Sequence, residues 1–186
     1  MAEWPYKMVD ESQRICISCG FCCDGTLFNN ASLKANEKGN LPPEIEKLYL
    51  QKNGKEFFSL PCPYFKSKCS IYYKKKPYVC SAYRCKLLKE VADNKISYYD
   101  AINIVKNAKE MRNAIMEYYS DLVDDRNILN FRELLKRVGA ILKEDEREAV
   151  IDESHDKFIG RCNIFEALLT KHFRSEKDFE NMIADE

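Results

Sequence analysis

The residues of this sequence whose type and spacing could do chemistry are its nine cysteines, and eight of them lie within the first 85 residues. The first group, in the string CISCGFCC, is Cys16, Cys19, Cys22 and Cys23. Two residues between cysteines allow a tight turn to direct both sulfurs toward one centre, with backbone N–H groups turned toward the thiolates. Gly20 is expected to supply the conformational freedom that a loop around a metal needs.

The spacing of this first group indicates which metal it could bind. Three cysteines in steps of three match the opening of a ferredoxin-type run, in which successive thiolates ligate a cubane cluster. Structural zinc sites more often use two separated cysteine pairs. A ferredoxin-type run continues with three residues and a Cys-Pro, which are absent here, so the fourth ligand is expected farther along. Neighbouring side chains in extended chain point to opposite sides, so either Cys22 or Cys23 serves a second centre or stays a spare thiol.

The second group is Cys62, Cys69, Cys80 and Cys85. Four plus four thiolates allow two four-sulfur sites, or one cluster with additional structural thiols. The donor set suits a [4Fe–4S] cluster or Zn²⁺, and the CxxCxxC run places the cluster slightly ahead. Cys162 stands alone and is interpreted as a free thiol rather than a further ligand. The predicted metal ligands are Cys16, Cys19, Cys22, Cys23, Cys62, Cys69, Cys80 and Cys85.

These cysteines and the residues between them carry a resemblance to a known family. CISCGFCC followed by LPCPYFKSKCSIYYKKKPYVCSAYRC resembles the CxxCxxCC family of zinc- or iron-chelating domains, also called the YkgJ family of cysteine-cluster proteins. The match covers residues 16–85, and it departs from the usual pattern at Lys76 and Ser81, where arginine is usual. The resemblance implies metal binding without naming a reaction. Flagellin lysine methylases have a similar cysteine pattern, for which an iron–sulfur centre is implied, but their activity is not carried over to this shorter chain.

The cellular compartment, and with it the redox state of the cysteines, is predicted from the absence of a signal peptide. Residues 1–10 contain no apolar run like a signal peptide, and no stretch has the apolar length of a membrane span, so we expect a cytoplasmic protein without membrane contact. Cytosolic thiols are kept reduced, which favours metal binding over disulfides. Thirty basic residues balance thirty acidic ones, so net charge alone recruits no partner. No GxxxxGK[ST], HExxH or serine-elbow motif is present, and the sequence leaves open whether the protein is an enzyme.

Charge is nevertheless concentrated near the second cysteine group. No acidic residue occurs from Ser59 to Lys89, while lysines, one arginine and several tyrosines are interleaved there. Basic residues with stacking aromatics are typical of single-stranded nucleic-acid grooves. Cations beside thiolates also stabilise the negative charge of a metal centre, and we favour this second interpretation. An accessory or modification-related role is predicted, with a protein partner allowed; the alternative is a zinc-stabilised module that binds nucleic acid or protein without catalysis.

Two regions are needed to position these residues. Residues 1–92 contain all six prolines and four of six glycines, which predicts an irregular, loop-rich module stabilised by cysteine and metal. Within it, a helix is expected from Pro42 and Pro43 to Gly54. Residues 93–186 are predicted to be helical and packed on the module, so the fold class is mainly α, and the two regions could form one compact domain. Ser97 and Asp100 predict a capping box.

Three helices are expected in this second region, each with an apolar face. The first starts near Ile96, the second covers 127–143 and the third covers 163–173. The charged stretch 143–156 is expected to be a solvated helix or a linker. The expected faces are Ile102, Val105, Ile115 and Tyr119 in the first helix; Ile128, Phe131, Leu135, Val138 and Leu142 in the second; and Ile164, Ala167, Leu168 and Lys171 in the third.

Overall fold

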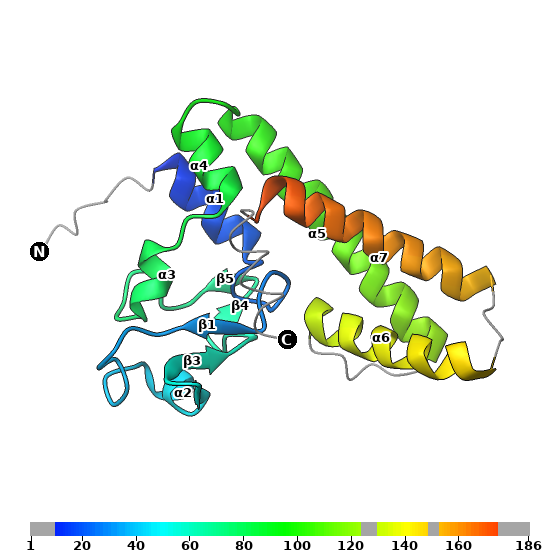
Figure 1. Cartoon of the computed structure of the whole chain (residues 1–186). Helices are drawn as coiled ribbons and strands as arrows, with labels where there is room; N and C mark the ends of the chain where they lie inside the picture. The colour runs from blue at the N-terminus through cyan, green and yellow to red at the C-terminus, as the bar shows by residue number, and fades with distance from the viewer. Residues whose placement is uncertain (1–9, 124–129, 149–152, 175–186) are drawn as a thin grey trace, which may run out of the picture.

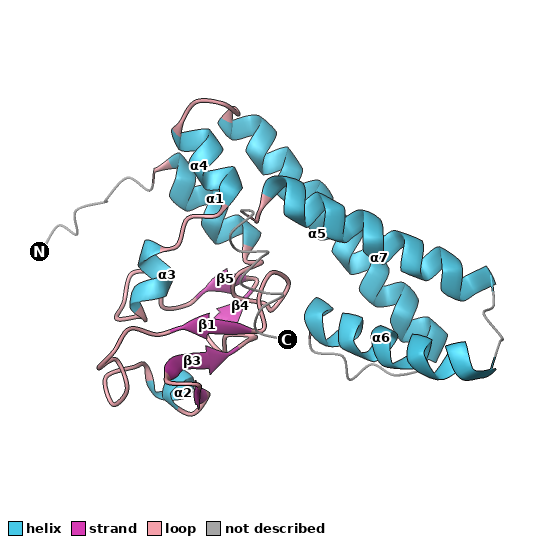
Figure 2. Cartoon of the chain, viewed as in Figure 1, coloured by secondary structure: helices cyan, strands magenta, loops and turns pink. Residues whose placement is uncertain are grey.

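A computed structural model of the chain describes residues 10–123, 130–148 and 153–174, and helices make up most of it (Figures 1 and 2). The predicted class, mainly α, is confirmed at this level. In chain order the elements are α1 (Glu11–Cys19), β1 (Asn30–Ser32), α2 (Pro43–Glu46), β2 (Tyr49–Lys52), β3 (Lys55–Ser59), β4 (Phe65–Lys66), β5 (Lys68–Cys69), α3 (Tyr78–Ala82), α4 (Lys86–Ala92), α5 (Tyr98–Val123), α6 (Phe131–Glu148) and α7 (Glu153–His172).

Two small antiparallel sheets occupy the part of the chain between α1 and α3 (Figure 2). The larger has the strand order β1-β3-β2, and its hairpin pairs Tyr49 with Phe58. The smaller consists of β4 and β5, in which Phe65 pairs with Cys69. One face of the larger sheet and α2 enclose a first hydrophobic cluster, which we call the sheet core. Its buried members are Ile45, Phe58, Leu60, Cys62 and Ile71.

The long helix α5 is the centre of the second hydrophobic cluster, which we call the helical core. Helices α1, α4, α6 and α7 all contact α5 (Figure 1). The buried side chains come from both ends of the chain, since Ile15 and Phe21 pack in the same cluster as Phe165 and Phe173. Residues from both sides of position 92 therefore share the helical core.

The cysteine-containing region has more regular structure than the prolines and glycines suggest. The helix expected from Pro42 to Gly54 is wrong in its second half, because α2 ends at Glu46. Tyr49–Ser59 instead forms the β2–β3 hairpin, with Asn53 and Gly54 in the left-handed conformation of its turn. The spacing of Ile45, Leu48 and Tyr49 fits a helix, and the exposed strand β2 has no alternation of buried and exposed positions that would have indicated a strand.

Three helices occur in the second region as predicted: α5 begins two residues after Ile96, and α6 and α7 overlap the expected ranges 127–143 and 163–173 with different bounds. Ser97 Oγ accepts a hydrogen bond from Asp100 N at 3.1 Å and donates one to Asp100 Oδ2 at 2.7 Å, which is the expected cap of α5. Val105, Ile115 and Tyr119 are buried, as expected for the packing face of that helix. The charged stretch 143–156 contributes the end of α6 and the start of α7, with residues 149–152 outside the described chain. Ile128 and the side chain of Leu142 also lie outside the described residues.

The predicted face of the last helix is wrong. Ile164, Ala167 and Lys171 are exposed on α7, and Ile164 has 61% of its surface accessible. The buried face is rotated and consists of Phe158, Cys162, Phe165, Leu169 and Phe173. The helix also begins ten residues earlier than expected, at Glu153. Aromatic side chains bury more apolar area than Ile164 and Leu168 do, so they decide which face packs against α5.

Candidate metal centre

The first cysteine group spans the last turn of α1 and the turn that follows it. Cys16 and Cys19 are helical, three residues apart and therefore on the same face of α1. The tight turn predicted between them is therefore wrong, and the turn begins only at Gly20. Cys22 and Cys23 lie in this turn, where Cys23 N donates to Gly20 O at 2.7 Å. The group thus presents two thiols from a helix and two from a loop.

Gly20 makes the change of direction possible. It ends α1 with φ of 76°, the left-handed conformation, and its N–H donates to Cys16 O at 3.3 Å. A Cβ at this position would overlap the ring of Phe65, which belongs to β4. The conformational freedom predicted for Gly20 is confirmed, and its missing side chain also lets the smaller sheet approach the cysteine turn.

Phe21 fixes the turn to the helical core. Its ring is fully buried and meets Phe173 at 5.2 Å and Phe165 at 6.3 Å between ring centroids, both edge to face. The guanidinium of Arg112 lies 5.4 Å from the Phe21 ring centroid. Since Phe21 stands between Cys19 and Cys22, packing of this ring by α5 and α7 sets the position of the cysteines on either side of it.

The segment after the cysteine turn is held by charged side chains from the helices. Asp24 forms an ion pair with Arg112 of α5, and its Oδ1 accepts from Thr26 N at 2.9 Å. Arg132 of α6 donates from Nε to Thr26 O at 2.9 Å. These contacts attach residues 24–26 to two helices that follow them in the chain by 86 residues or more.

Glu166 of α7 joins two buried arginines at the same place. Its Oε1 accepts from Arg132 Nη2 at 2.6 Å and its Oε2 accepts from Arg174 Nη1 at 2.9 Å. Arg174 Nη2 in turn donates to Leu27 O at 3.3 Å. The side chain of Arg174 has no exposed surface and that of Arg132 has 7%. This arginine–glutamate–arginine triad connects α6 and α7 to the chain that leaves the cysteine turn.

The second cysteine group comes from four different places in the fold. Cys62 is buried in the sheet core, and its N–H donates to Cys23 O at 2.7 Å. Cys69 ends β5, Cys80 lies in α3 and Cys85 immediately precedes α4. The two cysteine groups lie close enough to affect each other electrostatically, since Cys62 and Cys80 raise the pKa of Cys23.

Burial is the largest cause of the pKa shifts of these thiols. It raises the pKa of Cys19, Cys22 and Cys23 well above the ordinary value, and neighbouring cysteines raise it further. It also raises the pKa of Cys85 to about 11 and that of Cys80 to about 12. The metal-free thiols are therefore neutral at pH 7, so metal binding would have to displace their protons.

Two cations of the basic stretch act on the cysteines directly. Burial raises the pKa of Cys16, while the positive charges of Arg84 and Lys76 lower it. Lys76 lowers the pKa of Cys80 in the same way, against a larger effect of burial. Lys76 Nζ also donates to Tyr72 O at 2.7 Å, which fixes the ammonium beside the cysteines. Both cations stand where they would stabilise thiolate charge.

All nine cysteines lie in the described chain, and each is a free thiol. Among residues 10–123, 130–148 and 153–174, no group of three or more Cys, His, Asp or Glu side chains has an arrangement that could hold a metal ion. The predicted ligands are thus brought into one region without converging on a point. Cys162 is elsewhere, in the helical core on α7, and burial followed by Glu166 raises its pKa to about 12.

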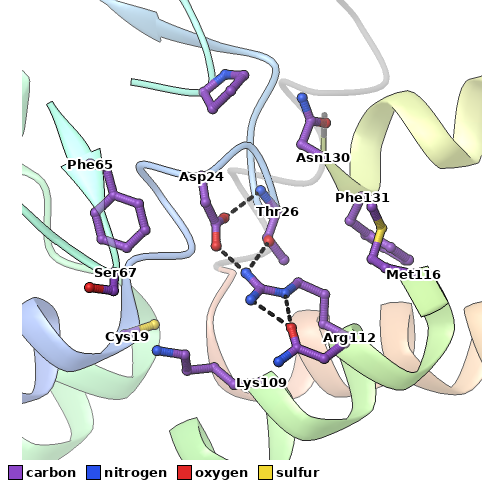
Figure 3. A pocket seen from close by; sticks show the side chains of 12 residues that line it. Cys19, Asp24, Thr26, Phe65, Ser67, Lys109, Arg112, Met116, Asn130 and Phe131 are labelled. Carbon is purple, nitrogen blue, oxygen red and sulfur yellow. Dashed lines mark hydrogen bonds and ion pairs between the residues drawn. The ribbon is translucent and has the colours of Figure 1, made fainter. Parts of the chain in front are cut away.

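A pocket of about 540 Å³ opens beside the first cysteine group (Figure 3). Lys109 and Arg112 extend into it from α5, and Lys109 Nζ donates to Ser18 O at 2.9 Å. Cys19 and Phe65 line the pocket on the side of α1 and β4. Because Arg112 is neutralised by an ion pair within the pocket, the charge of Lys109 leaves this space net positive.

Sequence reasoning did not identify Asp24, Arg112, Arg132, Glu166 or Arg174. Their contacts join parts of the chain between 34 and 147 residues apart, except for the Glu166–Arg174 pair, which is eight residues apart with Arg174 just beyond the end of α7. None of them belongs to a spaced motif, and charged residues on helices usually face solvent. The sequence contains one indication that the cysteine turn packs against the rest of the protein, namely Phe21, an aromatic residue within a cysteine run.

No family model, curated protein or solved structure matches the chain. The resemblance drawn from the cysteine spacing is therefore neither supported nor opposed by these comparisons. None of the described helices combines the length and apolar character needed to cross a bilayer.

Proposed function

We propose that this chain is a metal-binding cysteine-cluster protein in which thiolates hold an iron–sulfur cluster or Zn²⁺. The observation that carries the proposal is the gathering of eight free cysteines from separate elements into one region, with mutual effects on their pKa values. The proposed ligands are Cys16, Cys19, Cys22, Cys23, Cys62, Cys69, Cys80 and Cys85.

The chemistry of the donor set supports this assignment. Thiolates are soft ligands that select Zn²⁺ and iron–sulfur clusters over Mg²⁺ or Ca²⁺. The ferredoxin-like spacing of Cys16, Cys19 and Cys22 favours [4Fe–4S], and the resemblance to the CxxCxxCC family is compatible with either metal. A bound group would supply structural stabilisation as zinc, or electron transfer as a cluster. Loading it requires the thiols to lose their protons and move together.

The protein's own residues would support that loading. Arg84 and Lys76 favour the thiolate form of Cys16, so they lower the cost of deprotonating a partly buried site. The triad centred on Glu166 and the buried ring of Phe21 hold the cysteine turn against the helices, which limits the movement needed for its thiols to converge.

The pocket lined by Cys19 supports an accessory or modification-related role over a purely structural one. A metal centre that includes Cys19 would border a space with a positively charged wall, where a small anionic molecule could reach it. We propose a cytoplasmic protein, because none of its nine cysteines is paired in a disulfide, with a protein partner allowed and no membrane contact.

The alternative is a zinc-stabilised module that binds nucleic acid or protein. Lys74 and Lys75 are exposed, and Tyr73 beside them has 71% of its surface accessible. A Lys74→Glu/Lys75→Glu variant should then lose affinity for single-stranded oligonucleotides in a salt-dependent gel shift. Charge reversal at Lys52 and Lys55, which are exposed in the hairpin, is the matched control. Equal affinity of both variants and the parent protein for the oligonucleotide would exclude nucleic-acid binding by this segment.

The central experiment is an absorption spectrum with elemental analysis on full-length protein purified anaerobically. A brown sample with broad absorbance from sulfur-to-iron charge transfer and stoichiometric iron would establish a cluster. A colourless sample with stoichiometric zinc would establish a structural site. Absence of both metals from folded protein, with all thiols free, would refute the proposal.

A further inference from the structure

The two adjacent cysteines of the run belong to different hydrophobic cores. Cys22 packs against the helical core, as does Tyr83, whereas Cys23 packs against the sheet core, and Phe28 packs against both. Consecutive side chains in this turn are thus separated by the boundary between the two cores. A single tetrahedral centre would have to draw both side chains to one side of that boundary.

The cysteines on the helical side form one set. Cys19 and Cys85 are both buried in the helical core, where α1 contacts α4. Cys16 lies one helical turn before Cys19 on the same face of α1. With Cys22, these residues give three thiols of a CxxCxxC run and one remote thiol, Cys85, at the N-cap of α4.

The cysteines on the sheet side form a second set. Cys62 is buried in the sheet core, and Cys69 packs against it from β5. The backbone bond from Cys62 N to Cys23 O, 2.7 Å long, holds the cysteine turn beside this core. Val79 packs in the same cluster, which brings the start of α3 and hence Cys80 to its edge.

Electrostatic neighbours divide the cysteines along the same line. After burial, the largest influence on the pKa of Cys22 is Cys85, followed by Cys19. For Cys23 it is Cys62, followed by Cys80. The division thus holds for Cys22 and Cys23. Cys16 lies near both sets, since Cys69 raises its pKa and Cys16 in turn raises the pKa of Cys22 and of Cys23. Its place one helical turn before Cys19 on α1 assigns it to the helical set.

We infer that the chain carries two four-thiolate metal centres instead of one. The helical centre is formed by Cys16, Cys19, Cys22 and Cys85, and the sheet centre by Cys23, Cys62, Cys69 and Cys80. This inference rests on the proposed function and adds the number of centres and the ligands of each. The helical centre has the spacing that suits a cubane cluster. The sheet centre lacks that run, and its four thiolates make the closed four-sulfur donor set that a structural zinc ion accepts. The two centres adjoin through the peptide bond between Cys22 and Cys23.

The test uses one ligand of each centre that can be replaced without opening a core. Cys16 and Cys80 belong to neither hydrophobic core, and each keeps solvent-accessible surface although its thiol is partly desolvated, so Cys16→Ser and Cys80→Ser should leave the packing of both cores unchanged. Cys162→Ser, outside both sets, is the control. Full-length proteins are purified anaerobically and checked by circular dichroism. They are then labelled with iodoacetamide, and each cysteine is mapped by mass spectrometry, because metal-bound thiolates are protected from alkylation. A second measurement titrates metal-stripped protein with Zn²⁺ alone.

Two equivalents of Zn²⁺ are expected for the parent protein and the control, and one for each ligand variant. In Cys16→Ser, labelling should increase at least about tenfold at Cys19, Cys22 and Cys85, while the sheet set stays protected; Cys80→Ser should give the converse. One equivalent in the parent, or loss of protection at all eight cysteines in either variant, would overturn the two-centre inference and leave the proposed function intact. Protection lost from the sheet set in Cys16→Ser would overturn the stated ligand sets. No bound metal in the parent would refute the proposed function itself.

Discussion

The triad of Arg132, Glu166 and Arg174 provides the most quantitative prediction. Replacing Glu166 by glutamine keeps the shape of the side chain and removes its charge, so the local charge changes from +1 to +2. Both arginines are almost fully buried, with 7% and 0% of their side chains exposed, whereas Glu166 is 25% exposed. Breaking a buried ion pair costs about 3–5 kcal/mol. Because solvent reaches the carboxylate, we expect the lower end, a loss of about 3 kcal/mol in the free energy of unfolding.

For a chain of this size, that loss corresponds to a decrease in Tm of about 6–12 °C. Urea denaturation followed by circular dichroism measures the free energy directly. The control is Glu133→Gln, which removes an exposed pair with Arg137 of the same helix, 3.2 Å long, and should cost less than about 1 kcal/mol. Equal losses in the two variants would refute the reasoning, because the triad would then stabilise the fold no more than a surface pair.

The further predictions concern three single residues, Gly20, Ser97 and Cys162. Gly20→Ala should cost more than about 2 kcal/mol in urea denaturation, because a methyl group meets the Phe65 ring in addition to the strain of positive φ. Gly39→Ala has the strain alone, with no described atom within 4 Å, so equal losses would argue against the Phe65 contact. Ser97→Ala removes the cap of α5 and should cost about 1 kcal/mol; unchanged stability would show that the cap contributes nothing. At pH 8, native Cys162 should react with iodoacetamide at least about tenfold more slowly than in unfolded protein, since burial raises its pKa to about 12, and equal rates would contradict this. The Cys162 thiol keeps its proton to a higher pH in the folded state than in the unfolded state. It therefore lowers the free energy of unfolding only as the pH rises from about 9 toward about 12. Cys162→Ala should reduce this loss of stability at alkaline pH.

Local patterns in the sequence predict the helices of the second region and the cap of α5, because both depend on residues within one or two turns. Ser97 and Asp100 are three residues apart, and the hydrogen bonds between them form wherever the helix forms. The conformation of Gly20 was predictable for the same reason, since a glycine between closely spaced cysteines indicates a sharp turn. The cysteine groups themselves identify the region of the candidate site.

The remaining features depend on tertiary contacts that short patterns do not contain. The face of α7 is chosen by large aromatic side chains packing on α5 and Phe21, not by the spacing of Ile164 and Leu168. The hairpin of β2 and β3 replaces a predicted helix because pairing with β1 satisfies its backbone groups. The placement of Cys22 and Cys23 in different cores required both cores to be known.

The position of the cysteines in the chain has a consequence for protein synthesis. All eight proposed ligands have been synthesised once Cys85 is added, but Phe165 and Phe173, which cover Phe21 beside the helical set, follow by up to 88 residues. At the usual rate of translation, the delay is roughly 4–18 s. The sheet core needs nothing beyond Cys80 and can form first on the ribosome. The helical set stays uncovered during this interval, when a metal donor has access to it and oxidants do as well.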